Sequence, residues 1–295
     1  MRENEPALKV LKRERVDEKL HGLLQYPLTI VSAPIGYGKT TAVRTFLTNC
    51  RSPYIWTTMS ESVMITASEY FWYLVVKEFY KHFPDIANIF AERGFPQNSI
   101  EISRMIDFIQ DFEMKQDTVV VIDDYHLVEN EQIDLFLKRL ALAKIPWLHI
   151  VIISRGIPQV DIEELTMKGI CLFIQTSDLS FTEDEIKLYF ELVKFKGDDR
   201  IKQKICAASC GWIAVVYLMV TNFAHNYNLE YHNSVNKMLK SSFFDKYNTE
   251  TKIMLFKLAL FNIVTADSFH WITRAIINFI KYFLIFFIRR NPVGI

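Results

Sequence analysis

The sequence has no excess of charge of either sign, since 34 lysine and arginine residues balance 34 aspartate and glutamate residues among 295 positions. A nucleic-acid-binding domain usually carries a net basic face, so this balance speaks against direct DNA binding by the chain. Only 23% of the residues are charged, whereas 50% are hydrophobic. Intrinsic disorder requires low hydrophobicity with high net charge, and the composition therefore predicts a folded protein with a large core.

Cysteine is scarce as well, with four residues in the sequence. Four cysteines are too few for a disulfide framework in a chain of this length. Cys206 and Cys210 lie four positions apart in ligand-poor surroundings, so we expect two thiols on one helix face rather than a metal site. The charged residues 1–6 are not followed by an apolar stretch, which gives no sign of a secretory signal. These features together favour a reducing, cytoplasmic location.

Strongly apolar runs are short, and the most apolar one, residues 276–288, spans 13 residues and contains Lys281. A membrane-spanning helix needs roughly 20 mostly apolar residues, so this run is too short to cross a bilayer. Arg289 and Arg290 follow it, and interfacial helices do carry flanking arginines and aromatic residues. We expect a buried helix or an apolar tail, with contact to a membrane surface as the alternative.

Five short apolar runs predict β-strands. They are continuous rather than alternating, which indicates strands buried on both faces. Stretches with helical spacing separate them, and strands joined through helices form a mainly parallel sheet. The predicted strands are residues 28–32, 54–57, 119–122, 149–154 and 172–174, and the predicted helices are residues 13–24, 40–47, 69–82, 100–114 and 133–142. Residues 1–176 are thus predicted to form a three-layer α/β domain.

The character of the sequence changes after residue 176, where only helical patterns continue. Thr182, with Glu185 three positions later, forms a capping box that begins a helix. A polar run at 226–236 separates this region from the rest of the chain. We therefore predict a small helical domain at 177–228 and a third segment at 229–295.

The strongest sign of function is the run Ala-Pro-Ile-Gly-Tyr-Gly-Lys-Thr-Thr between a predicted strand and a predicted helix. It matches the phosphate-loop pattern G-x-x-x-x-G-K-[ST], with alanine at the first position. Glycines let backbone N–H groups turn toward phosphate oxygens, the lysine brings positive charge to the β- and γ-phosphates, and the threonine hydroxyl binds Mg²⁺. The predicted nucleotide-binding residues are Ala33, Pro34, Ile35, Gly36, Tyr37, Gly38, Lys39, Thr40 and Thr41. A plain glycine turn is the alternative interpretation.

Two acids follow the third predicted strand and an arginine follows the fourth. An acid at the carboxyl end of a buried parallel strand lies beside the phosphates, where it can hold Mg²⁺. We predict Asp123, together with Thr40, as the metal-side pair and Asp124 as the residue that orients or activates the attacking water. Arg155 is expected to reach the γ-phosphate and, with Lys39, completes the predicted catalytic set. The alternatives are acids that cap the next helix and a surface arginine.

Several segments together make the chain resemble the STAND class of signal-transducing P-loop ATPases. The resemblance is to the nucleotide-binding part of maltose-regulator-like transcription activators of the LuxR family in bacteria, and it extends from about residue 8 to about residue 272. It is carried by Val31–Thr41, Ile55–Thr57, Val121–Leu127, Ile152–Arg155, Leu179–Thr182 and Gly211–Ala214. Family members usually have proline where this chain has Ile213.

The resemblance implies a three-part ATPase module in which segment 229–295 is winged-helix-like with an atypical apolar tail. It also implies ATP or ADP with Mg²⁺, a closed monomer with ADP, self-association with ATP, and slow hydrolysis that resets the switch. Lys12, Arg13 and Arg15 are expected either to meet the nucleotide or to form a solvated basic stretch. The family's sensor and helix-turn-helix are missing, which implies a fragment, an early stop or a frameshifted end.

Two other functions stay open from the sequence. One is a truncated interaction protein or regulatory remnant that binds nucleotide but acts through self-association or membrane contact of its apolar tail. The other is a metabolic P-loop kinase, although no second substrate-binding signature accompanies the loop and the helical pattern after residue 177 does not suit that class.

Overall fold

A computed structural model gives the three-dimensional structure of the chain. It describes residues 9–50, 53–60, 65–112, 116–226, 247–248 and 251–252. The chain divides into two compact units, Met1–Tyr227 and Asn228–Ile295, and all elements below belong to the first. The predicted winged-helix-like segment, with its apolar run at 276–288, falls almost entirely outside the described residues. The finer division of the first unit at residue 176 stays a prediction.

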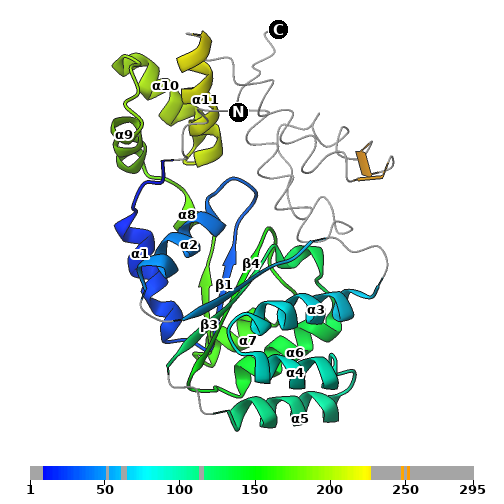
Figure 1. The fold of residues 1–295 in the computed structure, drawn as a ribbon. Coiled ribbons are helices and arrows are strands. Elements are labelled where there is room, and N and C mark those ends of the chain that lie inside the picture. The colour runs from blue at the N-terminus through cyan, green and yellow to red at the C-terminus, as the bar shows by residue number, and fades with distance from the viewer. Residues whose placement is uncertain are drawn as a thin grey trace, which may run out of the picture. The chain divides into compact units, whose positions relative to one another are not determined.

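Five strands form one sheet at the centre of the first unit (Figure 1). They are β1 (Leu28–Ser32), β2 (Tyr54–Thr58), β3 (Thr118–Asp123), β4 (Leu148–Ser154) and β5 (Cys171–Ile174). Their order across the sheet is β2-β3-β4-β1-β5, and every neighbouring pair is parallel. The predicted α/β fold with a parallel sheet is confirmed. Because all five strands run the same way, their carboxyl ends meet at one edge of the sheet.

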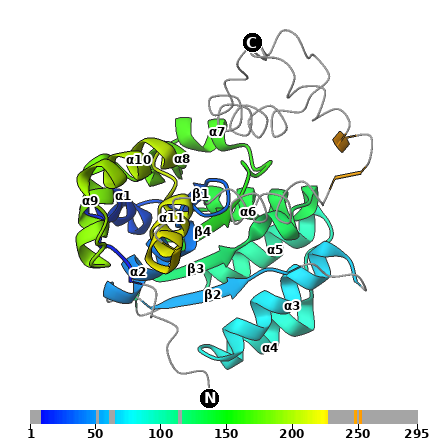
Figure 2. The same ribbon diagram turned by 90° about the horizontal axis from the view of Figure 1, so that it is seen from above.

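Helices cover both faces of the sheet, which makes the predicted three layers (Figure 2). The helices of this part are α1 (Glu14–Leu20), α2 (Lys39–Asn49), α3 (Ala67–Tyr80), α4 (Pro84–Arg93), α5 (Ser99–Gln110), α6 (Glu131–Leu142), α7 (Ile162–Met167) and α8 (Thr176–Leu179), with the 3-10 helices η1 (His21–Leu24) and η2 (Tyr125–Leu127). Ile30, Ile122 and Ile152 join one core with side chains of α3 to α6. Side chains alternate along a strand, so Val31 and Val121 face the opposite layer.

Polar residues before the helices explain where several of them begin. Thr66 caps α3 in a capping box with Glu69, and Asn98 accepts hydrogen bonds from the first backbone N–H groups of α5. The sequence pattern predicts Pro84 only as the end of the preceding helix. In the structure it is also the first residue of α4, a position where the N–H that proline lacks would have no partner within the helix. Helix α4 is therefore an addition to the predicted elements.

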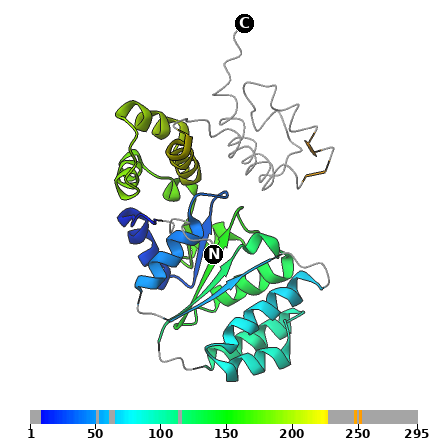
Figure 3. The same ribbon diagram turned by 45° about the horizontal axis from the view of Figure 1, so that its top comes forward.

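A group of three helices follows the sheet: α9 (Glu183–Leu192), α10 (Asp199–Ser209) and α11 (Ile213–Asn226), shown in Figure 3. We call residues 180–226 the helical segment. The backbone N–H of Glu185 donates to the Thr182 hydroxyl at 3.2 Å, which confirms the predicted capping box. Among the residues that the structure describes, none of the helices combines the length and apolar character needed to cross a bilayer.

Candidate functional site

The glycine-containing loop joins the carboxyl end of β1 to the start of α2 and thus lies at the edge where the strand ends meet. Gly36 and Gly38 both have φ of 80°, a backbone conformation that a side chain would strain. Gly38 is the N-cap of α2. Ala33, at the first position of the motif, is not among the residues with positive φ, so the alanine fits its place.

Lys39 is the first residue of α2, and its side chain turns back over the loop. The residue is only 8% exposed, and its Nζ donates to the backbone oxygen of Pro34 at 3.1 Å. Burial, and after it the charge of Arg155, lower the pKa of Lys39 to about 8. An ammonium group has three N–H donors, so this one retains donors for further oxygens. A buried cation with spare donors at a helix N-terminus is suited to binding an anion.

Thr40 and Asp123 come together across the gap between α2 and β3. The Thr40 hydroxyl donates to Asp123 Oδ1 at 3.1 Å, and the backbone N–H of Asp124 donates to the same oxygen at 3.0 Å. Asp123 is 3% exposed, and burial, with the neighbouring charge of Asp124, raises its pKa. The predicted metal-side pair is therefore in contact in this structure.

Asp124 and Arg155 lie at the ends of neighbouring strands in the same corner of the sheet. Asp124 adopts a left-handed backbone, with φ of 55°, and its carboxylate oxygen lies 4.0 Å from the Nδ1 atom of His126. The charges of both Asp124 and Arg155 act on Lys39. The structure therefore groups all four predicted catalytic residues, Asp123 among them, around the loop.

Two hydroxyl groups at the same edge were not predicted as site residues. Ser154 and Thr57 are each 1% exposed, and their side-chain oxygens have no hydrogen-bond partner among the described residues. Ser154 ends β4 beside Ser32 of β1, and its backbone oxygen accepts from the Ala33 N–H at 3.4 Å. A buried hydroxyl without a partner is costly, and the register places both hydroxyls on the sheet face of Ile122 and Ile152, opposite to Asp123.

A cavity of about 200 Å³ adjoins the loop on the side of the helical segment. Gly38 and Thr41 form one wall, and residues 9–13 form another. The remaining lining residues are Val16, Asp17, Ala42, Thr45, Phe181, Tyr189, Ile213, Ala214 and Tyr217. The cavity is thus mostly apolar, with basic side chains on its N-terminal wall.

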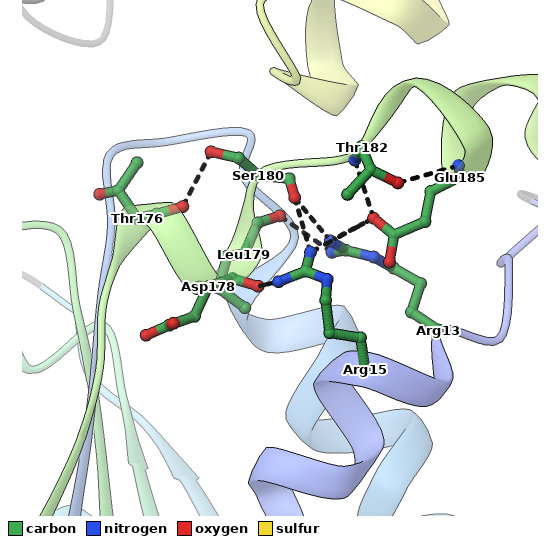
Figure 4. A network of polar contacts seen from close by, with 8 residues as sticks. All are labelled: Arg13, Arg15, Thr176, Asp178, Leu179, Ser180, Thr182 and Glu185. Atoms are coloured by element: carbon green, nitrogen blue, oxygen red, sulfur yellow. Dashed lines mark hydrogen bonds and ion pairs between the residues drawn. The ribbon is translucent and has the colours of Figure 1, made fainter.

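Two of the basic N-terminal residues, the buried Arg13 and the exposed Arg15, hydrogen-bond the chain at the start of the helical segment (Figure 4). The Arg13 guanidinium donates to the backbone oxygens of Leu179 and Ser180 at 2.9 and 3.0 Å and to Glu185 Oε2 at 2.9 Å. Arg15 donates to the Ser180 oxygen at 2.8 Å and to Glu185 Oε2 at 3.3 Å. Burial alone would raise the pKa of Glu185, but the hydrogen bonds from Arg13 and from the backbone N–H of Thr182 outweigh it and lower the pKa.

The fold and the loop together define the class of P-loop ATPases: a parallel sheet, a glycine loop between β1 and α2, and an acid at the end of β3. No protein-family model matches the chain. The solved structure of the Walker-type ATPase PABY2304 of Pyrococcus abyssi shares this fold, with a TM-score of 0.53 at 14% identity over 97% of this chain and 86% of that one.

Among curated proteins, the chain is similar to the HTH-type transcriptional regulator MalT of two Klebsiella pneumoniae strains. The identity is 24% over 227 residues in both cases, which covers 75% of this chain. The match spans only 25% of the regulator's length. The predicted resemblance to maltose-regulator-like P-loop ATPases is thereby confirmed. Together with the fold, this similarity supports a nucleotide-dependent regulatory ATPase module.

Proposed function

We propose that this chain is the nucleotide-binding switch module of a LuxR-family transcription regulator and that it holds ATP or ADP at the loop. The observation that carries the proposal is the meeting of Lys39, Thr40 and Asp123 at the carboxyl edge of the sheet. A structural salt bridge would not explain the position of Lys39. Its ammonium group hydrogen-bonds a backbone oxygen and retains donors for a ligand.

Each residue of the loop has a role in this proposal. Residues 35–38 turn their N–H groups to the phosphates, and Lys39 binds the β- and γ-phosphate oxygens. Arg155 contacts the γ-phosphate and so distinguishes ATP from ADP. Asp124 accepts a proton from, or orients, the water that attacks the γ-phosphate. Hydrolysis is expected to be slow, since a switch must keep its state long enough to signal.

Thr40 and Asp123 fit a magnesium site. Mg²⁺ prefers oxygen ligands and is commonly held by one or two protein groups, with water and phosphate supplying the others. A hydroxyl and a carboxylate in contact match that preference. Mg²⁺ bound there would neutralise charge between the β- and γ-phosphates. The described residues contain no cluster of three His, Cys, Asp or Glu side chains that would hold a metal without phosphate.

The cavity beside the loop is proposed to hold the nucleoside. Its apolar walls suit an aromatic base, and its direct contact with Gly38 and Thr41 places it next to the phosphates. Ile213, where similar proteins usually have proline, lines this cavity, so the substitution keeps an apolar wall. In this proposal the module works in the cytoplasm, self-associates in its ATP state and does not itself bind DNA.

The alternative, an interaction protein that acts through its apolar tail, depends on residues 276–288. These lie outside the described residues, and no observation on the first unit favours it.

The proposal is tested by titrating the chain with ADP and with ATP plus Mg²⁺ in a calorimeter. The wild-type chain is expected to bind both, and Lys39→Ala is expected to bind neither. Lys138→Ala is the matched control, because Lys138 is also a lysine on a helix beside the sheet but pairs with Asp161 and Glu164. A wild-type chain that folds but binds no nucleotide would refute the proposal.

A further inference from the structure

Trp212 of the helical segment contacts the phosphate-binding loop directly. Its indole Nε1 donates to the backbone oxygen of Ile35 at 2.9 Å. The indole ring stacks on Tyr37, with 5.9 Å between ring centroids and 8° between ring planes. Two residues later, the backbone N–H of Ala214 donates to the Gly36 oxygen at 3.2 Å. Two consecutive carbonyl groups of the loop are therefore bound by the helical segment.

These two hydrogen bonds fix the direction of the loop's N–H groups. A trans peptide is planar, so its C=O and N–H bonds point in opposite directions, and the described residues contain no cis peptide. Because the Ile35 and Gly36 oxygens point to the helical segment, the N–H groups of Gly36 and Tyr37 point away from it. In a phosphate loop such N–H groups are the donors to phosphate oxygens. Trp212 thus acts on the orientation of the donors without touching the phosphate.

The backbone on both sides of this contact is shaped to permit it. A Cβ atom on Gly36 would lie 2.5 Å from Ala214 Cβ and 2.6 Å from the Trp212 Nε1 atom, which is too close for any side chain. On the other side, Gly211 has φ of 79°, and a Cβ there would lie 2.6 Å from the Phe181 oxygen. Phe181 and Gly211 are joined by a backbone hydrogen bond of 2.9 Å, which holds the turn that leads into Trp212.

The start of the helical segment is held independently. Arg13 binds the Leu179 and Ser180 oxygens and Glu185, and its guanidinium carbon lies 3.9 Å from the Phe181 ring centroid. Since Phe181 is bonded to Gly211, the N-terminal residues also support the turn before Trp212. The contacts of Trp212 and Ala214 thus join the helical segment to the loop, while Arg13 holds the chain that leads into the segment.

We infer that Trp212 is a positioning residue that holds the loop in its phosphate-binding form, so that nucleotide affinity depends on docking of the helical segment. This inference rests on the proposed function, because it requires that the loop binds nucleotide. By linkage, nucleotide binding must then strengthen the docking of the helical segment by the same factor. A movement of that segment would therefore weaken nucleotide binding through the loop as well as through the cavity walls that the segment supplies.

The test compares two tryptophan variants in the full chain, with ADP as the probe. Trp212→Phe removes the indole donor and keeps an aromatic ring. Trp72→Phe is the matched control, because Trp72 Nε1 also donates to a backbone oxygen at 2.9 Å, that of Phe90. The two tryptophans are similarly buried, with Trp72 6% and Trp212 8% exposed. The hydrogen bonds are alike, so both variants are expected to lose similar stability in urea. Only Trp212→Phe is expected to weaken ADP binding, by about five- to tenfold.

Equal ADP affinities of the two variants would overturn the inference while leaving the proposed function intact. A wild-type chain without ADP binding would refute both. Should Trp212→Phe not fold, Tyr37→Ala provides the second measurement, since it removes the ring that stacks on the Trp212 indole. It is expected to weaken ADP binding by roughly two- to tenfold, and an unchanged affinity would again overturn the inference.

Discussion

The buried position of Lys39 makes nucleotide affinity depend on pH in a calculable way. Its pKa in the empty protein is about 8, lowered chiefly by burial. A bound phosphate group favours the charged lysine and is expected to return the pKa to its ordinary value near 10.5. Binding above pH 8 must therefore take up a proton. The protonated fraction of Lys39 in the empty protein falls from about 0.9 at pH 7 to about 0.1 at pH 9. The ADP dissociation constant is thus expected to rise about tenfold over this range, or about 1.4 kcal/mol.

Calorimetry in buffers of different ionisation enthalpy measures both the ADP dissociation constant and the number of protons taken up on binding. At pH 9 the uptake is expected to approach one proton per ADP, and at pH 7 about a tenth of a proton. Lys39→Arg is the matched control, since a guanidinium does not titrate in this range, and any binding it retains is expected to be independent of pH. The terminal phosphate, with a pKa of about 6, is fully ionised at pH 9 but still about a tenth protonated at pH 7, so the uptake at pH 9 is the decisive measurement. Constant affinity with no proton uptake in the wild-type chain would refute the reasoning.

Two further predictions concern Asp123 and the buried hydrogen bond between Tyr125 and Asp134. Asp123→Asn keeps an acceptor for the Thr40 hydroxyl but loses the charge, so the gain in ATP affinity on adding Mg²⁺ is expected to fall by about 1.5–3 kcal/mol. Titrations with Mg²⁺ and with a chelator measure it, and an unchanged magnesium effect would exclude Asp123 as the metal-side residue. Tyr125→Phe removes the 2.7 Å hydrogen bond from the fully buried hydroxyl to Asp134 and is expected to cost about 1–3 kcal/mol in urea unfolding at pH 7. Tyr73→Phe, at an exposed position, is its control and should leave the stability unchanged.

The sheet and the loop were predictable because their signals are local. Each strand is a continuous apolar run, and the loop is a contiguous motif whose glycines and lysine lie within a few positions of one another. The meeting of Thr40 and Asp123 is a long-range contact, yet it follows from the parallel sheet, because a strand-end acid must lie beside the loop. The apolar run that ends in Asp123 therefore allowed its contact with Thr40, 83 positions away, to be predicted.

The contacts of Arg13, Arg15 and Trp212 could not be predicted in the same way. Most of their partners are backbone oxygens, which every residue has, so no residue type marks the acceptor. Trp212 reaches Ile35 across 177 positions, and Arg13 reaches Leu179 across 166. The sequence could suggest that the basic stretch meets nucleotide or solvent, but only the fold shows that the stretch supports the chain entering the helical segment.

Gly36 shows how the two kinds of information combine. The phosphate-loop pattern demands glycine at its first and sixth positions, which here are Ala33 and Gly38, and leaves position 36 free. The structure nevertheless imposes two conditions there: a φ of 80° and the close approach of Trp212 and Ala214. Glycine satisfies both, whereas at Ala33 neither condition applies. The glycine at a position that the pattern leaves free is thus explained by the helical segment packed against it, which shapes this loop together with the phosphate it is proposed to bind.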